Sequence, residues 1–170
     1  MDFLPPLDIV ARLGTALILG GALGLERERK NRPAGFRTMI LISLGTAGFM
    51  IAGHEVIHAA ASENGTTLAG ADISRVLQGL IGGVGFLGAG AVLQNKKAVR
   101  GLTTAAAVWV TACVGAAAGF GLYTLAVTLA VMALFTLIVL EWVEDKYFPD
   151  PNGESEVNDG DVKPHSHHKV

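Results

Sequence analysis

The chain has 170 residues, of which 51% are hydrophobic and only 16% are charged, and its mean hydropathy is +0.46. Soluble domains are about one quarter charged, so this composition excludes an ordinary soluble domain and is typical of a polytopic membrane protein. The net charge of -2 gives no reason to expect nucleic-acid binding, and the single cysteine cannot form an intrachain disulfide.

Five apolar segments follow one another along the chain, each close to the ~20 residues that a transmembrane helix needs. They cover residues 7–25, 38–60, 73–93, 102–120 and 122–143. The first lacks basic residues before it and is followed by ERERK, which favours a retained span over a cleaved signal peptide. Only GFGLY separates the last two, so a tight hairpin is expected and four spans with one broken segment are the alternative. The predicted fold is an all-α membrane helix bundle of about five spans within residues 1–143.

Basic residues in the short loops predict the orientation of the chain. The first loop contains Arg27, Arg29, Lys30, Arg32 and Arg37, and the third contains Lys96, Lys97 and Arg100. The positive-inside rule therefore places the amino terminus outside and the carboxyl terminus in the cytoplasm. Residues 144–170 are acidic, contain histidines and have few apolar side chains, so a disordered cytoplasmic tail is expected. Loose metal binding by the tail histidines is the minor alternative to a solvated terminus.

Residues 54–58 read HEVIH and match the zinc-protease pattern H-E-x-x-H. On a helix, His54 and His58 lie on one face and could share a metal ion, with Glu55 polarising a bound water. Counted from Thr38, His54 lies about 24 Å along a helix, near the outer interface. No familiar third-ligand motif accompanies the pattern. A metalloprotease is therefore a remote alternative, and the sequence predicts no metal site.

Residues 83–90, GVGFLGAG, match the dinucleotide pattern G-x-G-x-x-G, but the strand that this pattern requires before it is missing from the sequence. Small residues allow close approach between membrane helices, so packing is the better interpretation. The glycines predicted to pack helices are Gly20, Gly24, Gly79, Gly83, Gly85, Gly88 and Gly90.

Polar residues at the ends of the spans are the candidate functional groups, because burying them in a membrane is costly. Arg12 is expected either to reach the headgroups or to pair with an acid such as Asp72. Asp72 itself suits a helix N-cap. Thr103 and Thr104 could cap the fourth span or bridge to a neighbouring helix, and Trp109 is deep enough to be a packing anchor or a pocket wall.

The stretches GLERE, RPAGFRT, GFLGAG and VRGLTTAA, in this order between residues 20 and 123, resemble the membrane domain of the MgtC/SapB family. The resemblance implies a bacterial inner-membrane protein, linked to magnesium limitation, acid tolerance and virulence, that acts on other membrane proteins. It implies functional roles for Glu26, Arg27, Glu28, Arg32, Arg37, Asp72, Arg75, Arg100, Thr103, Thr104, Trp109 and Cys113. Pro33 and Gly35 also belong to the family pattern. Two departures are Ile73, where the family often has proline, and a short tail in place of the soluble carboxyl-terminal domain of many members.

The function expected from these observations is non-enzymatic support of growth or survival under magnesium limitation or acid stress, with no catalytic residue and no cofactor. Mg²⁺ is expected at most as a ligand or a signal. The expected partners are the lipid bilayer and a membrane protein or a second copy of the chain. The main alternative is a transporter or channel for Mg²⁺ or another ion, although the spans contain no acid near mid-membrane to coordinate it.

Overall fold

The computed structural model describes residues 4–64, 69–95, 98–140 and 146, with backbone only for residues 58–64, 69–72, 93–95, 98–100 and 140. Five helices form the bundle: α1 (Pro6–Arg29), α2 (Phe36–Asn64), α3 (Ala69–Ala91), α4 (Leu102–Gly119) and α5 (Tyr123–Phe135). α5 continues as a short π-helix, η1 (Thr136–Leu140). The predicted all-α membrane bundle is confirmed. The predicted disordered tail lies outside the described residues except for Lys146.

Four of these helices are long and apolar enough to cross a membrane, and the apolar segment Tyr123–Val139 is a shorter fifth. The fourth and fifth segments are joined by a tight turn at Phe120–Leu122, where Gly121 has a φ of 76°. This turn favours glycine, because a left-handed backbone is costly for other residues. The predicted hairpin is therefore present, and the broken single span is excluded.

Both ends of α3 differ from the predictions. α3 ends at Ala91 rather than at residue 93, because β1 (Leu93–Asn95) and β2 (Ala98–Arg100) form an antiparallel pair in the third loop. α3 is already helical at Ala69, so Asp72 lies inside the helix and the expectation of an N-cap at Asp72 was wrong.

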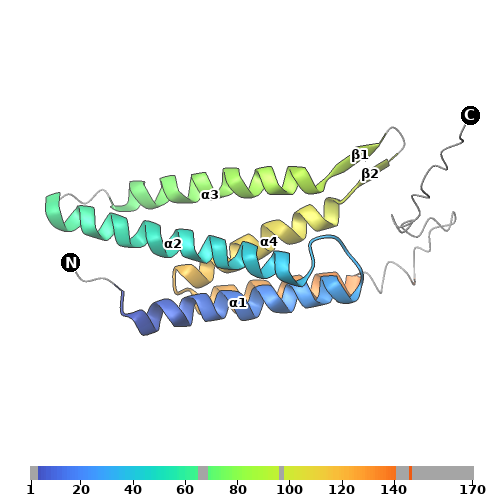
Figure 1. Cartoon of the computed structure of the whole chain (residues 1–170), viewed down its shortest axis with the longest axis horizontal. Helices are drawn as coiled ribbons and strands as arrows, with labels where there is room; N and C mark the ends of the chain where they lie inside the picture. Colours follow the sequence, from blue (N-terminus) through green and yellow to red (C-terminus); the bar gives the residue numbers. More distant parts are fainter. Residues whose placement is uncertain (1–3, 65–68, 96–97, 141–145, 147–170) are drawn as a thin grey trace, which may run out of the picture.

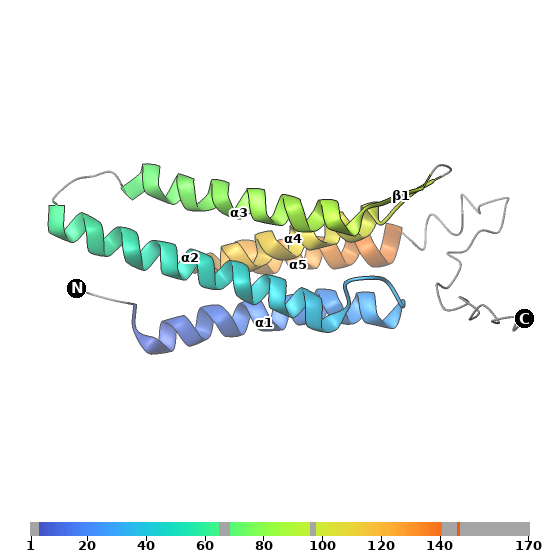
Figure 2. The same ribbon diagram turned by 45° about the horizontal axis from the view of Figure 1, so that its top comes forward.

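The helices lie nearly side by side, with α2 packed against both α1 and α4 and with α3 on the opposite side of the bundle from α1 (Figures 1 and 2). The chain reverses direction at every connection, so the same end of the bundle carries the last turn of α1, the loop at residues 30–35, the β-hairpin and the first turn of α4. We call this the Arg27 end. The opposite end, with the first turns of α1 and α5, is the Arg12 end.

Glycine pairs allow the backbones of the central helices to meet. A Cβ on Gly20 of α1 would lie 2.6 Å from Cβ of Ser43 on α2, and one on Gly24 would lie 2.7 Å from Cα of Phe36. A Cβ on Gly119 of α4 would lie 2.6 Å from the Ala47 carbonyl oxygen, and one on Gly115 would overlap the Ser43 carbonyl. α2 is therefore clasped by one small-xxx-small pair on each side. The Ser43 hydroxyl also donates to the Ala16 carbonyl across 2.8 Å, which adds a polar link between α2 and α1.

Candidate functional site

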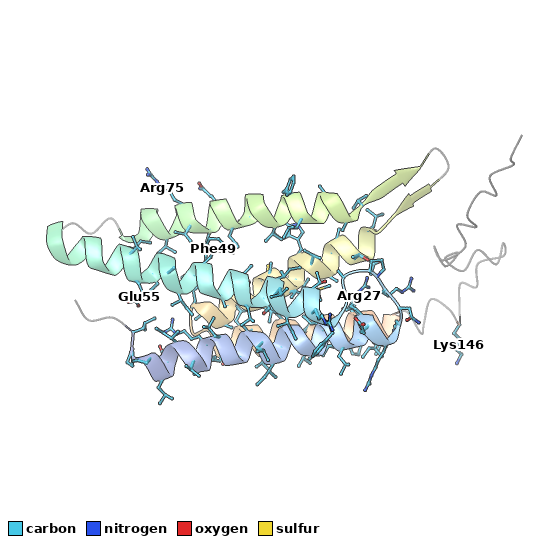
Figure 3. The ribbon with its side chains drawn as sticks, viewed as in Figure 1. Arg27, Phe49, Glu55, Arg75 and Lys146 are labelled. Atoms are coloured by element: carbon cyan, nitrogen blue, oxygen red, sulfur yellow. The ribbon has the colours of Figure 1, made fainter. Side chains whose placement is uncertain are left out.

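A buried arginine joins three segments at the Arg27 end. Arg27 is 3% exposed. Its Nη2 donates to the Thr104 hydroxyl of α4 at 2.6 Å and to the Pro33 carbonyl of the first loop at 3.3 Å. These bonds offset part of the cost of burying this charge. Figure 3 shows Arg27 directed into the bundle near its end.

The neighbouring Glu26 belongs to a second polar contact. Its side chain is 8% exposed, and its Oε1 lies 3.0 Å from Nζ of Lys30 one turn later. Lys30 Nζ also donates to the Leu137 carbonyl of η1 at 3.2 Å, which links the end of α1 to the π-helical turn. Glu26 Oε2 is buried and, within the described residues, has no hydrogen-bond partner.

Glu28 holds the first loop in place. Its Oε2 accepts a hydrogen bond from the Phe36 backbone N–H at 3.0 Å, so a side chain of α1 caps the first turn of α2. The loop is tight, because Asn31 and Ala34 have φ values of 52° and 56°. A Cβ on Gly35 would collide with the Glu28 carboxylate. A larger residue at this position would push aside the Glu28 carboxylate that caps Phe36, so the glycine of RPAGFRT and the acid of GLERE take part in one contact.

The other predicted residues are more widely distributed. Arg32 is half-buried, whereas Arg37, Thr103 and Cys113 are exposed. Arg75 lies on α3 toward the Arg12 end and extends away from the bundle (Figure 3), so it does not join the polar contacts around Arg27. Trp109 lies on α4 beside α3, where a Cβ on Gly88 would be 3.5 Å from its Cδ1. The side chains of Asp72 and Arg100 lie outside the described part of the structure.

The predicted packing glycines fall into two groups. Gly20, Gly24 and Gly88 face another helix closely. Gly79, Gly83, Gly85 and Gly90 of α3 would each place a Cβ with nothing within 4 Å. The α3 glycines therefore leave a thin surface that the described chain does not fill.

A groove runs along this surface between α2 and α3, with a volume of about 640 Å³. Its walls include Gly45 and Phe49 of α2 and Gly79, Gly83 and Leu87 of α3. Figure 3 shows Phe49 extending from α2 toward α3. A Cβ on Gly45 would also have nothing within 4 Å, so glycines without close neighbours lie on both the α2 wall and the α3 wall of the groove.

The HEVIH pattern lies within α2, about two turns before the helix ends at Asn64. Glu55 accepts hydrogen bonds from the Leu4 backbone N–H at 3.2 and 3.3 Å, and His54 Nδ1 lies 3.8 Å from Glu55 Oε1. The side chain of His58 lies outside the described part of the structure. The pattern is therefore seen in a contact that fastens the start of the chain to α2. The described residues hold no group of three or more potential metal ligands.

The partners of Arg12 in the structure differ from those expected from the sequence. Its Nη2 lies 2.8 Å from Asp8 Oδ2, one turn earlier in α1, and its Nη1 donates to the Gly119 carbonyl at 2.8 Å. The cation thus binds the carboxyl end of α4, which carries the negative end of the helix dipole. An i, i+4 acid was the available sequence signal, but the link to Gly119 required the three-dimensional arrangement.

A bundle of apolar helices with these internally paired charges defines a multi-pass helical membrane protein. The MgtC family model matches residues 13–146, and the chain belongs to this family. The Escherichia coli K12 protein named "Putative magnesium transporter YhiD" is 41% identical over 134 residues, which are 79% of this chain and 60% of that protein. SapB of Bacillus subtilis is 36% identical over 88% of this chain and 64% of its own length.

MgtC of Brucella abortus is 36% identical over 82% of this chain and 52% of its own length. The chain therefore spans about 60% of the length of YhiD and about half of this MgtC protein. No solved structure matches the chain. The family resemblance carried by GLERE, RPAGFRT, GFLGAG and VRGLTTAA is confirmed.

Proposed function

We propose that this protein supports growth or survival under magnesium limitation or acid stress in the bacterial inner membrane, by binding another membrane protein through the α2–α3 groove. Its role is regulatory rather than enzymatic, and the occupant of the groove is a transmembrane helix of the regulated protein. The observation that carries the proposal is the thin, glycine-lined groove.

The groove suits a helix because its glycines would destabilise α2 and α3 without any compensating contact if only lipid packed against them. Each glycine in a helix costs about 1 kcal/mol relative to alanine. In a bilayer, lipid offers no hydrophobic drive for helix association, and glycine offsets its cost by allowing the backbone of another helix to approach closely. Only 11% of the α3 span is buried inside the bundle, compared with 56% of α4, so α3 has the most surface to offer among the four long helices.

Substitution of Gly83 by leucine tests this proposal. A Cβ at this position meets nothing within 4 Å in the described chain, and the rest of a leucine side chain would occupy the groove that Gly83 lines. Gly14→Leu on α1 is the matched control, because Gly14 is also open and lies outside the groove. We expect Gly83→Leu to lose growth at limiting magnesium at a normal protein level, and Gly14→Leu to grow normally. Wild-type growth of Gly83→Leu would contradict the proposal.

In-membrane crosslinking identifies the occupant. A photoreactive residue at Phe49, which is 68% exposed in the groove, should capture a membrane protein, and Gly83→Leu should abolish the capture. A photoreactive residue at Val131, exposed on α5, is the control position. If the only crosslinked product is a dimer of this chain, the occupant of the groove is a second copy of the chain and not another membrane protein.

Direct ion transport is the second candidate, and the name of YhiD favours it. Flux of Mg²⁺ into liposomes that contain the purified protein, above that into empty vesicles, would establish it. No flux across several ions would remove it and leave the regulatory role.

A further inference from the structure

A second cavity lies on a different face of the bundle, between α4 and α5 at the Arg27 end. Its volume is about 300 Å³, which is within the range of ligand sites. Arg27, Thr103 and Thr136 line its end nearest the helix termini, and Val110 and Leu129 line its deeper part. Seven residues of α4 separate Thr103 from Val110, which corresponds to about 10 Å along the helix. The cavity is therefore elongated, with a polar end and an apolar end.

The deeper part offers no unused polar side chain. Thr111 lines it, but its hydroxyl donates to the Ala107 carbonyl at 2.8 Å and lies 3.3 Å from the Met39 sulfur. The remaining lining of that part is aliphatic, from Val110, Leu129 and Ala133. Such a surface fits a hydrocarbon chain and disfavours a hydrated ion.

The polar end is positive for two independent reasons. The first reason is Arg27, which lines the cavity and is only 3% exposed to solvent. The amino terminus of α4 begins beside it, and the N-cap residue Gly101 has no side chain to accept from the first-turn N–H groups. A helix amino terminus favours anions, and an arginine suits a phosphate.

The cavity opens sideways. Thr103, Ala106, Met132 and Thr136 line it and are also exposed on the outer surface of the bundle. In a protein whose helices span a membrane, that surface faces lipid. A chain from the surrounding bilayer can therefore enter between α4 and α5 without passing through water.

We propose that this cavity binds an anionic phospholipid, with its phosphate at Arg27 and the amino terminus of α4 and one acyl chain running between α4 and α5. The headgroup lies where the helices end and the chain points toward the middle of the bilayer, which is the direction that a lipid takes in a leaflet. A choline or ethanolamine ammonium beside the guanidinium would be repelled, so phosphatidylglycerol is preferred over phosphatidylcholine.

Lipid retention by the purified full chain tests the site. The protein is exchanged into detergent with phosphatidylglycerol or phosphatidylcholine, and native mass spectrometry counts the lipids that stay bound. We expect one phosphatidylglycerol, held about tenfold better than phosphatidylcholine, the difference expected from one charge-assisted hydrogen bond. Equal retention of the two lipids would overturn the assignment of the phosphate to Arg27.

Two variants and two controls locate the bound lipid. Ala106→Phe fills the mouth of the cavity, and Arg27→Gln removes its charge. Val131→Phe adds the same ring to an exposed site of α5 outside the cavity, and Arg29→Gln removes an exposed charge at the same end. The lipid should be lost from the first pair and kept by the second.

Retention by Ala106→Phe, or equal loss from Arg29→Gln, would show nonspecific surface binding and overturn the proposal. If Arg27→Gln fails to fold, the comparison of Ala106→Phe with Val131→Phe decides alone. Because this cavity and the α2–α3 groove lie on different faces, loss of lipid from Ala106→Phe leaves helix capture at Phe49 unchanged. The two proposals can therefore fail separately.

Discussion

Arg27 on α1 and Thr104 on α4 are 77 residues apart in the sequence and are joined by a buried hydrogen bond of 2.6 Å. The hydroxyl accepts this hydrogen bond from the guanidinium of a residue that is only 3% exposed. Both residues belong to short patterns that indicate the family, GLERE and VRGLTTAA. Their contact gives these patterns a shared structural role at the Arg27 end.

Removing this acceptor should destabilise the fold. We expect Thr104→Val to lower the free energy of unfolding by about 1.5–3 kcal/mol, the usual contribution of a hydrogen bond to a charged group. Thr128→Val is the matched control, because its hydroxyl is exposed and bonds only within α5, to the Thr124 carbonyl. Thermal unfolding in detergent measures both. An equal effect of the two variants would show that the Arg27 bond has no special weight.

Alanine at Gly115 should also be costly. The added Cβ would overlap the Ser43 carbonyl, and relief requires α4 to move away from α2. We expect a loss of about 1–3 kcal/mol in the free energy of unfolding, as for other overpacked positions. Gly14→Ala should instead stabilise α1 by up to about 1 kcal/mol, because its Cβ meets nothing. A lower unfolding temperature for Gly115→Ala and a higher one for Gly14→Ala, each relative to the wild type, would confirm the packing. A stabilised Gly115→Ala would contradict it.

Glycine at Ala34 should stabilise the first loop. Ala34 has a φ of 56°, a left-handed conformation that costs about 1–2 kcal/mol for a residue with a side chain. Part of the gain is lost because glycine is more flexible in the unfolded chain, so a net increase of about 0.5–1 kcal/mol is expected. Ala106→Gly in α4 should have the opposite effect. A lower unfolding temperature for Ala34→Gly would exclude strain at this residue.

Two variants at the Arg12 end should differ in severity. Asp8→Asn weakens a partly exposed ion pair, which contributes about 0–1 kcal/mol. Arg12→Gln also removes the donor to the Gly119 carbonyl and should cost about 1.5–3 kcal/mol in the free energy of unfolding. Chemical or thermal unfolding of each variant tests the order. The reverse order would place the stabilisation in the ion pair.

Cysteine labelling tests the orientation predicted from the basic loops. Cys113 is the single cysteine of the chain, so Cys113→Ser provides a cysteine-free background. In that background, Leu122→Cys at the Arg12 end should react with an impermeant maleimide in intact cells, whereas Lys146→Cys should react only after permeabilisation. Both positions are exposed. The opposite pattern would invert the predicted topology.

Hydropathy predicted the five helices well, because each crossing needs its own long apolar run. The clasp by Gly115 and Gly119 was missed, although GAAAG is a small-xxx-small pattern in the sequence. It lies in an alanine-rich run, where glycine stands out less than in α3. Conversely, Gly79 and Gly83 stand out strongly in the sequence, yet the described chain supplies no close neighbour for them. Sequence spacing reveals a thin face but does not reveal what covers it.

The sequence predicted which polar residues would form contacts, but it did not predict which of them would contact each other. GLERE and the threonines of VRGLTTAA were recognised as candidates because charged and polar groups at span ends need satisfaction. Which of them meet depends on helix rotation and on the register between α1 and α4, which a single sequence does not encode in local patterns. Arg12 was therefore expected either to reach the headgroups or to pair with an acid such as Asp72, whereas the structure pairs it with Asp8.

α1 grips α4 at both extremities, with Arg27 at the first turn of α4 and Arg12 at its final carbonyl. These two contacts resist sliding of one helix along the other, so α1 and α4, with α2 packed against both, form a fixed frame. α3 packs directly against this frame: a Cβ on Gly53 of α2 would lie 3.0 Å from Val76 of α3, and one on Gly88 of α3 would lie 3.5 Å from Trp109 of α4. An occupant that widened the α2–α3 groove would have to separate these contacts, so a helix that fits the existing width of the groove is favoured.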